Sequence, residues 1–192
     1  MAEHAAVRLT PAEARLACLV GVERRLASFR LRDRPGIRPE MVWLMDMEGA
    51  GAELAVAKVT GWYWDGAVGT FHDRADVRAV HVRHTIHPAG HLLIRPGLDV
   101  AGIYVLVTGM MPDYAVQGWA RWPGCEVIEA RPDPARAPAL MVQPGTLREV
   151  AELVELAALA EVGERLARAG LANSSAVKGS PDGPPPPPPT EP

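Results

Sequence analysis

Apolar residues recur at helical spacing in three parts of the chain. The first part opens at Thr10, where threonine can cap a helix, proline fits its first turn and Glu13 completes a capping box. The second covers residues 39–60 and meets a natural C-terminal stop at Gly61. The third covers residues 146–169, again behind a threonine-to-glutamate capping box. The pattern predicts three helices, and residues 1–8 are predicted to form a loose start.

Two glycines lie inside the second predicted helix. Glycine in a helix interior costs about 1 kcal/mol against alanine. Gly49 and Gly51 therefore indicate either a break near residue 49 or a place where another element packs closely. Most apolar residues of this segment can share one side of a helix, which favours packing against a sheet.

Between the second and third predicted helices the pattern changes to short runs of branched and aromatic residues, bounded by glycine, proline or aspartate. Such runs are typical of β-strands. The run at residues 103–108 is nearly all apolar and predicts a central, buried strand. The predicted strands are residues 61–70, 77–85, 91–95, 103–108, 116–120 and, at an edge, 139–142.

These elements predict an α/β fold, with a central mixed sheet of four to five strands flanked by helices and with a long C-terminal helix. We expect an N-terminal helix in residues 1–35, an α/β core in residues 36–145, the C-terminal helix in residues 146–170 and a disordered, proline-rich tail in residues 171–192. A tail of this composition cannot build a core. It is either a solubilising extension or a segment that docks into an aromatic-lined groove of a partner.

Composition and charge narrow the function classes. The chain has 192 residues, of which 48% are hydrophobic, and a net charge of −3, so no global charge attracts nucleic acid. No apolar run approaches the roughly 20 residues of a membrane span. No secretory signal is evident, so we expect a cytoplasmic protein without membrane association. Cys18 and Cys125 lack a C-x-x-C spacing, which argues against a disulfide scaffold or a structural zinc site.

Candidate chemistry lies in the second predicted helix and the strand that follows it. Glu53 is on the helix, and Asp76 comes just before the strand at residues 77–85. Residues two apart on a strand point the same way, so His81 and Arg83 should share one face. An acid on a helix, an acid before a strand and two polar residues on that strand form a candidate site.

Residues 49–53, followed by an apolar helix and Gly61, resemble the first helix of the PD-(D/E)xK nuclease superfamily. That family has a G-x-x-x-E helix, an aspartate at the start of a strand and a (D/E)-x-K on the next strand. Asp76 matches the aspartate, and residues 81–83 stand where (D/E)-x-K would be. The resemblance covers about residues 40–120 and implies a restriction-endonuclease-like core. The chain is also similar to phage and prophage proteins with a G-E-L-A-V-A-K helix. This second resemblance implies no activity for the chain.

The resemblance implies a metal-dependent phosphodiesterase acting on DNA. Glu53, Asp76 and His81 would be the metal ligands, and Asp76 and Arg83 the catalytic residues, with Arg83 on the scissile phosphate. Histidine in place of a carboxylate would weaken Mg²⁺ binding and favour Mn²⁺ or Zn²⁺. Arginine in place of lysine keeps its proton but holds a phosphate through two parallel hydrogen bonds. Arg24 and Arg25 would join Arg83 in contacting nucleic acid.

Other interpretations remain open. The altered motif is also compatible with an inactive core, in a non-catalytic, phage-type binding or assembly protein that contacts a protein partner through its last helix and tail. The arginines of the first helix are either a solvated face or a DNA contact. Five of the six histidines lie between His72 and His91, where they are either metal ligands or ordinary solvated and core residues. Trp62 and Trp64 are either core residues or stacking platforms for bases.

Overall fold

The protein is described here from a computed structural model, which describes residues 4–29, 38–69, 75–95, 99–129 and 139–168. The chain divides into two units, residues 1–159 and 160–192. The first helix and the α/β core therefore belong to one unit. The predicted proline-rich tail at residues 171–192 lies outside the described residues. No helix in the described part combines the length and the apolarity that a membrane crossing requires.

The two predicted N-terminal helices are present. Helix α1 spans Pro11–Ser28 and helix α2 spans Pro39–Thr60, ending at Gly61 in a left-handed conformation. The predicted capping box of α1 is confirmed: the Glu13 backbone N–H donates to the Thr10 hydroxyl at 3.3 Å, and the Thr10 N–H donates to the Glu13 carboxylate at 2.6 Å. Lys58 of α2 also donates to the Glu13 carboxylate, at 2.8 Å, and so connects the two helices.

Glu13→Gln is expected to make the free energy of unfolding less dependent on pH at acidic pH. The hydrogen bond from Lys58, helped by that from Thr10, lowers the pKa of Glu13 from its usual 4.5 to about 2. A carboxyl with a lower pKa in the folded chain stabilises it above the unfolded pKa and loses this contribution as the pH falls. Between about pH 5 and pH 2 the free energy of unfolding, measured with urea, should fall more steeply in the wild type than in Glu13→Gln. Glu23→Gln on the same helix should follow the wild type; parallel curves for all three proteins would contradict this assignment.

A mixed four-stranded sheet forms the centre of the first unit, as predicted. The strand order is β1-β5-β4-β2, with β2 parallel to β4 and the other neighbours antiparallel. A second, three-stranded sheet has the order β3-β7-β6. The strands are β1 Ala5–Arg8, β2 Val80–Thr85, β3 Leu92–Ile94, β4 Gly102–Met110, β5 Asp113–Trp122, β6 Ile128–Glu129 and β7 Leu140–Val142.

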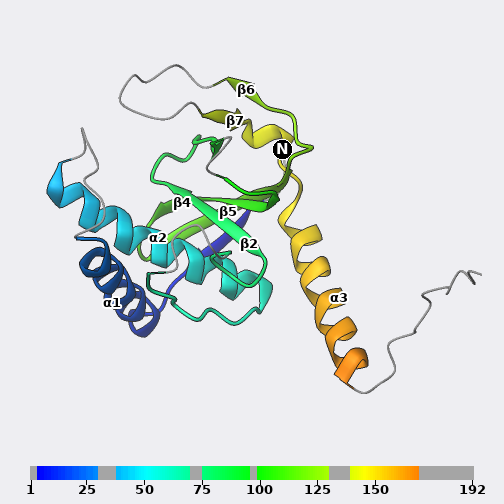
Figure 1. The fold of residues 1–192 in the computed structure, drawn as a ribbon, viewed down its shortest axis with the longest axis horizontal. Coiled ribbons are helices and arrows are strands. Elements are labelled where there is room, and N and C mark those ends of the chain that lie inside the picture. Colours follow the sequence, from blue (N-terminus) through cyan, green and yellow to red (C-terminus); the bar gives the residue numbers. More distant parts are fainter. Residues whose placement is uncertain (1–3, 30–37, 70–74, 96–98, 130–138, 169–192) are drawn as a thin grey trace, which may run out of the picture. The chain divides into compact units, whose positions relative to one another are not determined.

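The predicted central strand is buried on both of its faces. Val105 and Val107 of β4 pack with α2 in one apolar cluster, while Tyr104 and Leu106 pack with β3 and β7 in a second one. Helix α2 thus covers one face of the four-stranded sheet and the second sheet contacts the other. Helix α1 lies beside α2, so that α2 stands between α1 and the sheet (Figure 1).

Two expectations about strands are wrong. The start of the chain is not loose, because residues of β1 pair antiparallel with β5, from Ala5 opposite Val116 to Arg8 opposite Asp113. Residues 61–69 form no strand. Trp62 and Trp64 are both buried in the α2 cluster, as core residues.

The predicted capping box at Thr146 is also wrong. Thr146 ends a short 3-10 helix, Pro144–Thr146, and its hydroxyl donates to the Gln143 carbonyl at 2.9 Å. Arg148 then exchanges two backbone hydrogen bonds with Trp119 of β5, at 2.8 and 3.1 Å. This bridge keeps the chain extended, so α3 begins later and spans Val150–Arg168. Within the first unit, α3 buries Val150, Leu153 and Ala157 in the α2 cluster.

The helical glycines differ in what surrounds them. Helix α2 continues without a break through Gly49, where an added Cβ would meet no atom within 4 Å. At Gly51 a Cβ would collide with the Tyr114 hydroxyl, which is the close packing that the sequence indicated. Gly21 of α1 is as tightly packed, since a Cβ there would lie 2.7 Å from the backbone nitrogen of Met47.

Gly21→Ala and Gly49→Ala are therefore expected to have opposite effects. Gly21→Ala forces two helix backbones apart and should lower the free energy of unfolding by about 2 kcal/mol. Gly49→Ala enters open space and should raise it by up to about 1 kcal/mol through helix propensity. Chemical denaturation of the two variants beside the wild type measures both effects. Equal destabilisation by both substitutions would contradict the helix packing described here.

Candidate functional site

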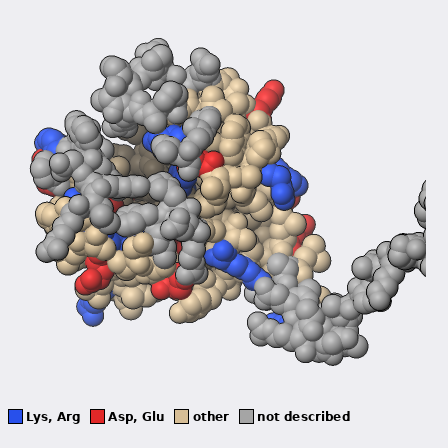
Figure 2. Space-filling model, viewed as in Figure 1, with Lys and Arg blue, Asp and Glu red and all other residues tan. Residues whose placement is uncertain are grey.

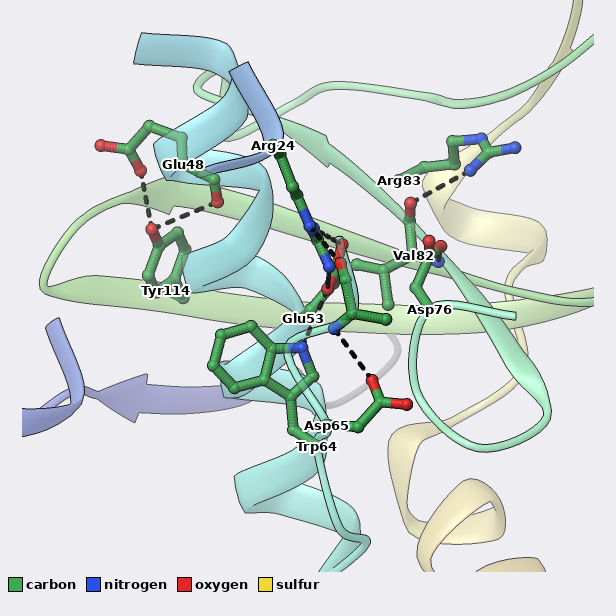
Figure 3. Close-up of polar contacts among 10 residues, drawn as sticks. Arg24, Glu48, Glu53, Trp64, Asp65, Asp76, Val82, Arg83 and Tyr114 are labelled. Atoms are coloured by element: carbon green, nitrogen blue, oxygen red, sulfur yellow. Dashed lines mark hydrogen bonds and ion pairs between the residues drawn. The ribbon is translucent and has the colours of Figure 1, made fainter. Parts of the chain in front are cut away.

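Glu53 lies in the interior of the fold. Its side chain extends from α2 toward α1 and the segment that follows α2, and the residue is only 6% exposed. Arg24 of α1 donates to both carboxylate oxygens, from Nη1 to Oε1 at 2.6 Å and from Nη2 to Oε2 at 2.8 Å. The indole N–H of Trp64 donates to Oε2 at 2.9 Å (Figure 3). Both oxygens of the carboxylate are therefore engaged.

Arg24 holds three segments together. Besides the two bonds to Glu53, its Nε donates to the Ala67 carbonyl at 2.9 Å. The guanidinium thus joins α1, α2 and the residues after α2 in one arrangement. A bidentate pair between arginine and a carboxylate is among the strongest polar contacts in proteins.

Burial is the largest influence on the pKa of both Glu53 and Arg24. Burial raises the pKa of Glu53, against the lowering effect of the Arg24 hydrogen bonds, and the nearby negative charge of Asp76 raises it further. Burial lowers the pKa of Arg24, but the hydrogen bond and charge of Glu53, with the charges of Asp76 and Asp46, outweigh it and raise the pKa. Arg24 therefore keeps its positive charge under the influence of the carboxylates of Glu53, Asp76 and Asp46.

Asp76 acts on this pair through its charge, and its own hydrogen bonds are to β2. It precedes β2, and its backbone N–H donates to the Val80 carbonyl at 3.0 Å. Its Oδ2 accepts a hydrogen bond from the Val82 N–H at 2.7 Å. The Asp76 carboxylate therefore satisfies a backbone N–H of β2. Its negative charge also raises the pKa of both Glu53 and Arg24.

His81 and Arg83 lie on the other face of the sheet. They share one face of β2, as predicted, but Val80 and Val82 take the face that packs on α2. His81 stacks on Tyr104 with ring centroids 4.8 Å apart, and the Arg83 guanidinium lies 5.0 Å from the same ring. Since Tyr104 belongs to the cluster with β3 and β7, neither residue joins Glu53.

The predicted metal ligands Glu53, Asp76 and His81 are thus not brought together. Within the described ranges, no group of three or more histidine, cysteine or acidic side chains could hold a metal ion. Mg²⁺ needs several oxygen ligands around it, whereas the oxygens of Glu53 already face a guanidinium and an indole. As a set, Glu53, Asp76 and His81 therefore do not fit a divalent metal.

The predicted nucleic-acid contacts do not form one surface. Arg24 points inward to Glu53, and the guanidinium of Arg25 lies 5.2 Å from the centre of the Phe29 ring. Arg83 donates to Asp99 at 2.7 Å and to the Val82 carbonyl at 3.2 Å. Arg24 and Arg83 therefore donate hydrogen bonds within the protein rather than toward a phosphate.

The histidines are dispersed. His84 contacts the Gly109 carbonyl through Nε2 at 2.9 Å and meets the Tyr114 ring edge-on. His87 and His91 are exposed. His72 lies outside the described residues.

Sequence reasoning missed the residues that bind Glu53. The sequence predicts a solvated or DNA-binding face for Arg24 and a strand for Trp64, and neither prediction indicates a contact with Glu53. Sequence reasoning also missed a second buried carboxylate, Glu48, which accepts hydrogen bonds from the Tyr114 hydroxyl at 2.7 Å and from the Met111 N–H at 3.0 Å. No local pattern signals these pairs, because their partners are far apart along the chain.

Comparison of the chain with protein-family models, with curated proteins and with solved structures found no match.

Proposed function

We propose that this chain is a non-catalytic binding protein built on a nuclease-like core. The observation that carries the proposal is the burial of Glu53 against Arg24 and Trp64. Both oxygens of this carboxylate accept hydrogen bonds from donors inside the fold, which hold it toward those donors rather than toward a metal. The carboxylate stabilises the fold instead.

The order of acidic residues supports the nuclease-like part of the proposal. Glu53 on α2 and Asp76 before β2 follow the order of the acidic residues in the PD-(D/E)xK superfamily, whereas His81 and Arg83 lie on the strand that Asp76 precedes rather than on the next one. We therefore assign a restriction-endonuclease-like origin to the core. In this proposal the guanidinium of Arg24 supplies the positive charge beside Glu53 and Asp76 that a divalent cation supplies in an active nuclease.

The charges of the chain favour a protein partner over DNA. Acidic and basic side chains stand scattered among uncharged ones on the face that Figure 2 shows. Together with the net charge of −3 and the inward-facing Arg24, this distribution offers little attraction for a phosphate backbone.

Helix α3 supplies a surface for such a partner. Within the first unit, Leu153 and Ala157 are buried, whereas Leu156 and Leu159 are 40% and 67% exposed. A helix that is apolar beyond its buried side offers anchors for another chain. A phage-type assembly role is the form of this function that the sequence resemblance suggests.

The second candidate function is a metal-dependent phosphodiesterase, which the effect of the Asp76 charge on the pKa of Glu53 favours. Incubation of the purified protein with single- and double-stranded DNA under Mg²⁺, Mn²⁺ or Zn²⁺ distinguishes the two. We expect no cleavage by the folded protein with any metal. Cleavage by the wild type that disappears in Asp76→Ala would overturn the proposal.

A further inference from the structure

The outer face of α1 exposes three leucines. Leu16, Leu19 and Leu26 are 49%, 59% and 50% exposed, and their spacing places them on one side of the helix. The opposite side of α1, with Ala17 and Gly21, is buried. Because α2 stands between α1 and the sheet (Figure 1), this leucine face points away from the core.

Two opposite charges flank the central leucine. Arg15 lies four residues before Leu19 and Glu23 four residues after it, so all three follow one row along the helix. Both charged residues are exposed, and neither forms an ion pair with another residue that the structure describes. At a rise of about 1.5 Å per residue, each charge lies roughly 6 Å along the helix from Leu19.

This charge pattern is complementary to its own antiparallel copy. When two such helices run in opposite directions with Leu19 facing Leu19, Arg15 of each copy faces Glu23 of the other at an equal distance from the centre. A parallel arrangement would place like charges opposite each other. Symmetric dimers need such a self-complementary patch.

We propose that the leucine face of α1 (Leu16, Leu19 and Leu26) is the interface of a homodimer. The two copies of α1 pack antiparallel about a two-fold axis at Leu19, with a leucine centre and two Arg15–Glu23 pairs. The partner is a second copy of this chain. The inference goes beyond the proposed function and does not depend on it, because it involves neither Glu53 nor α3.

The interface is small, so the dimer should be reversible. One helix of 18 residues offers less area than the roughly 800 Å² per partner of a standard stable interface. Sedimentation velocity should therefore find monomer and dimer whose ratio changes with protein concentration.

Charge reversal tests the pairing. Arg15→Glu places two carboxylates opposite each other at each end of the interface and should raise the dimer Kd at least about tenfold. Glu23→Arg should act likewise, and the double variant Arg15→Glu/Glu23→Arg should restore the wild-type Kd. Both positions are exposed on α1, and circular dichroism checks the fold. Failure of the double variant to recover, or a monomer at every concentration, would overturn the proposal.

Cysteine cross-linking tests the axis. Helices packed about 8–10 Å apart bring two copies of residue 19 within disulfide range. Leu19→Cys should therefore form a covalent dimer under mild oxidation. Ala12→Cys, whose two copies would lie roughly 21 Å apart along an antiparallel pair, should not. Cys18 and Cys125 remain in both variants and in the wild type, which serves as the background. Equal cross-linking of both variants would contradict the antiparallel arrangement.

Discussion

Arg24→Met is expected to lower the free energy of unfolding by about 3–5 kcal/mol, which is the usual cost of removing one partner of a buried ion pair. The substitution leaves the Glu53 carboxylate, 6% exposed, without its two bonds from the guanidinium. Urea unfolding at neutral pH measures the loss. Arg25→Met is the matched control. The Arg25 guanidinium lies over the Phe29 ring and forms no ion pair with a residue in the described ranges, so its loss should cost less than about 1 kcal/mol.

The double variant Arg24→Met/Glu53→Leu distinguishes a lost ion pair from a general loss of packing. Removing both charges leaves no uncompensated carboxylate, so much of the lost stability should return. In Arg24→Met alone, burial raises the pKa of Glu53 without opposition from Arg24, so protonation at lower pH should relieve the cost. A double variant that is less stable than Arg24→Met would contradict this explanation.

Tyr114→Phe is expected to have the second-largest effect, a loss of about 3 kcal/mol. The Tyr114 hydroxyl donates to the buried Glu48 carboxylate at 2.7 Å, and burial together with this carboxylate raises the pKa of the phenol far above its usual value. Without this hydroxyl, the Glu48 carboxylate keeps the hydrogen bond from the Met111 N–H as its only one from a residue that the structure describes. Because this network connects α2 to β5 and the turn before it, thermal unfolding should shift clearly. Tyr63→Phe, at an exposed position, is the control; equal effects of the two variants would show that the hydroxyl contributes little.

The helices and the central sheet were predictable because local signals set them. Thr10 and Glu13 fix the start of α1, and Gly61 ends α2 in the left-handed conformation that glycine tolerates. The apolar run of β4 indicated a strand buried on both faces. β1 was missed because Ala5 to Arg8 has little strand character of its own and is held by pairing with β5. The bridge between Trp119 and Arg148 likewise overrode a local capping signal.

The candidate site was predictable only in part. Alternation along β2 correctly placed His81 and Arg83 on one face, but it could not tell which face meets α2. Both faces of the sheet carry apolar residues, so hydrophobicity did not decide between them. Nor could spacing show that Arg24 reaches Glu53, because the two residues are 29 positions apart and meet only through the packing of α1 on α2.

The central claim is that Arg24 and Trp64 exclude a divalent metal from Glu53. Its most direct test is the effect of Mn²⁺, which broadens nearby NMR resonances, on the indole N–H signal of Trp64, assigned with Trp64→Phe. The indole of Trp119, which donates to the Glu149 carbonyl at 3.1 Å, is the internal reference. We predict that Mn²⁺ leaves the Trp64 signal as sharp as that of Trp119. Selective broadening of Trp64 would place a metal at Glu53 and contradict the account.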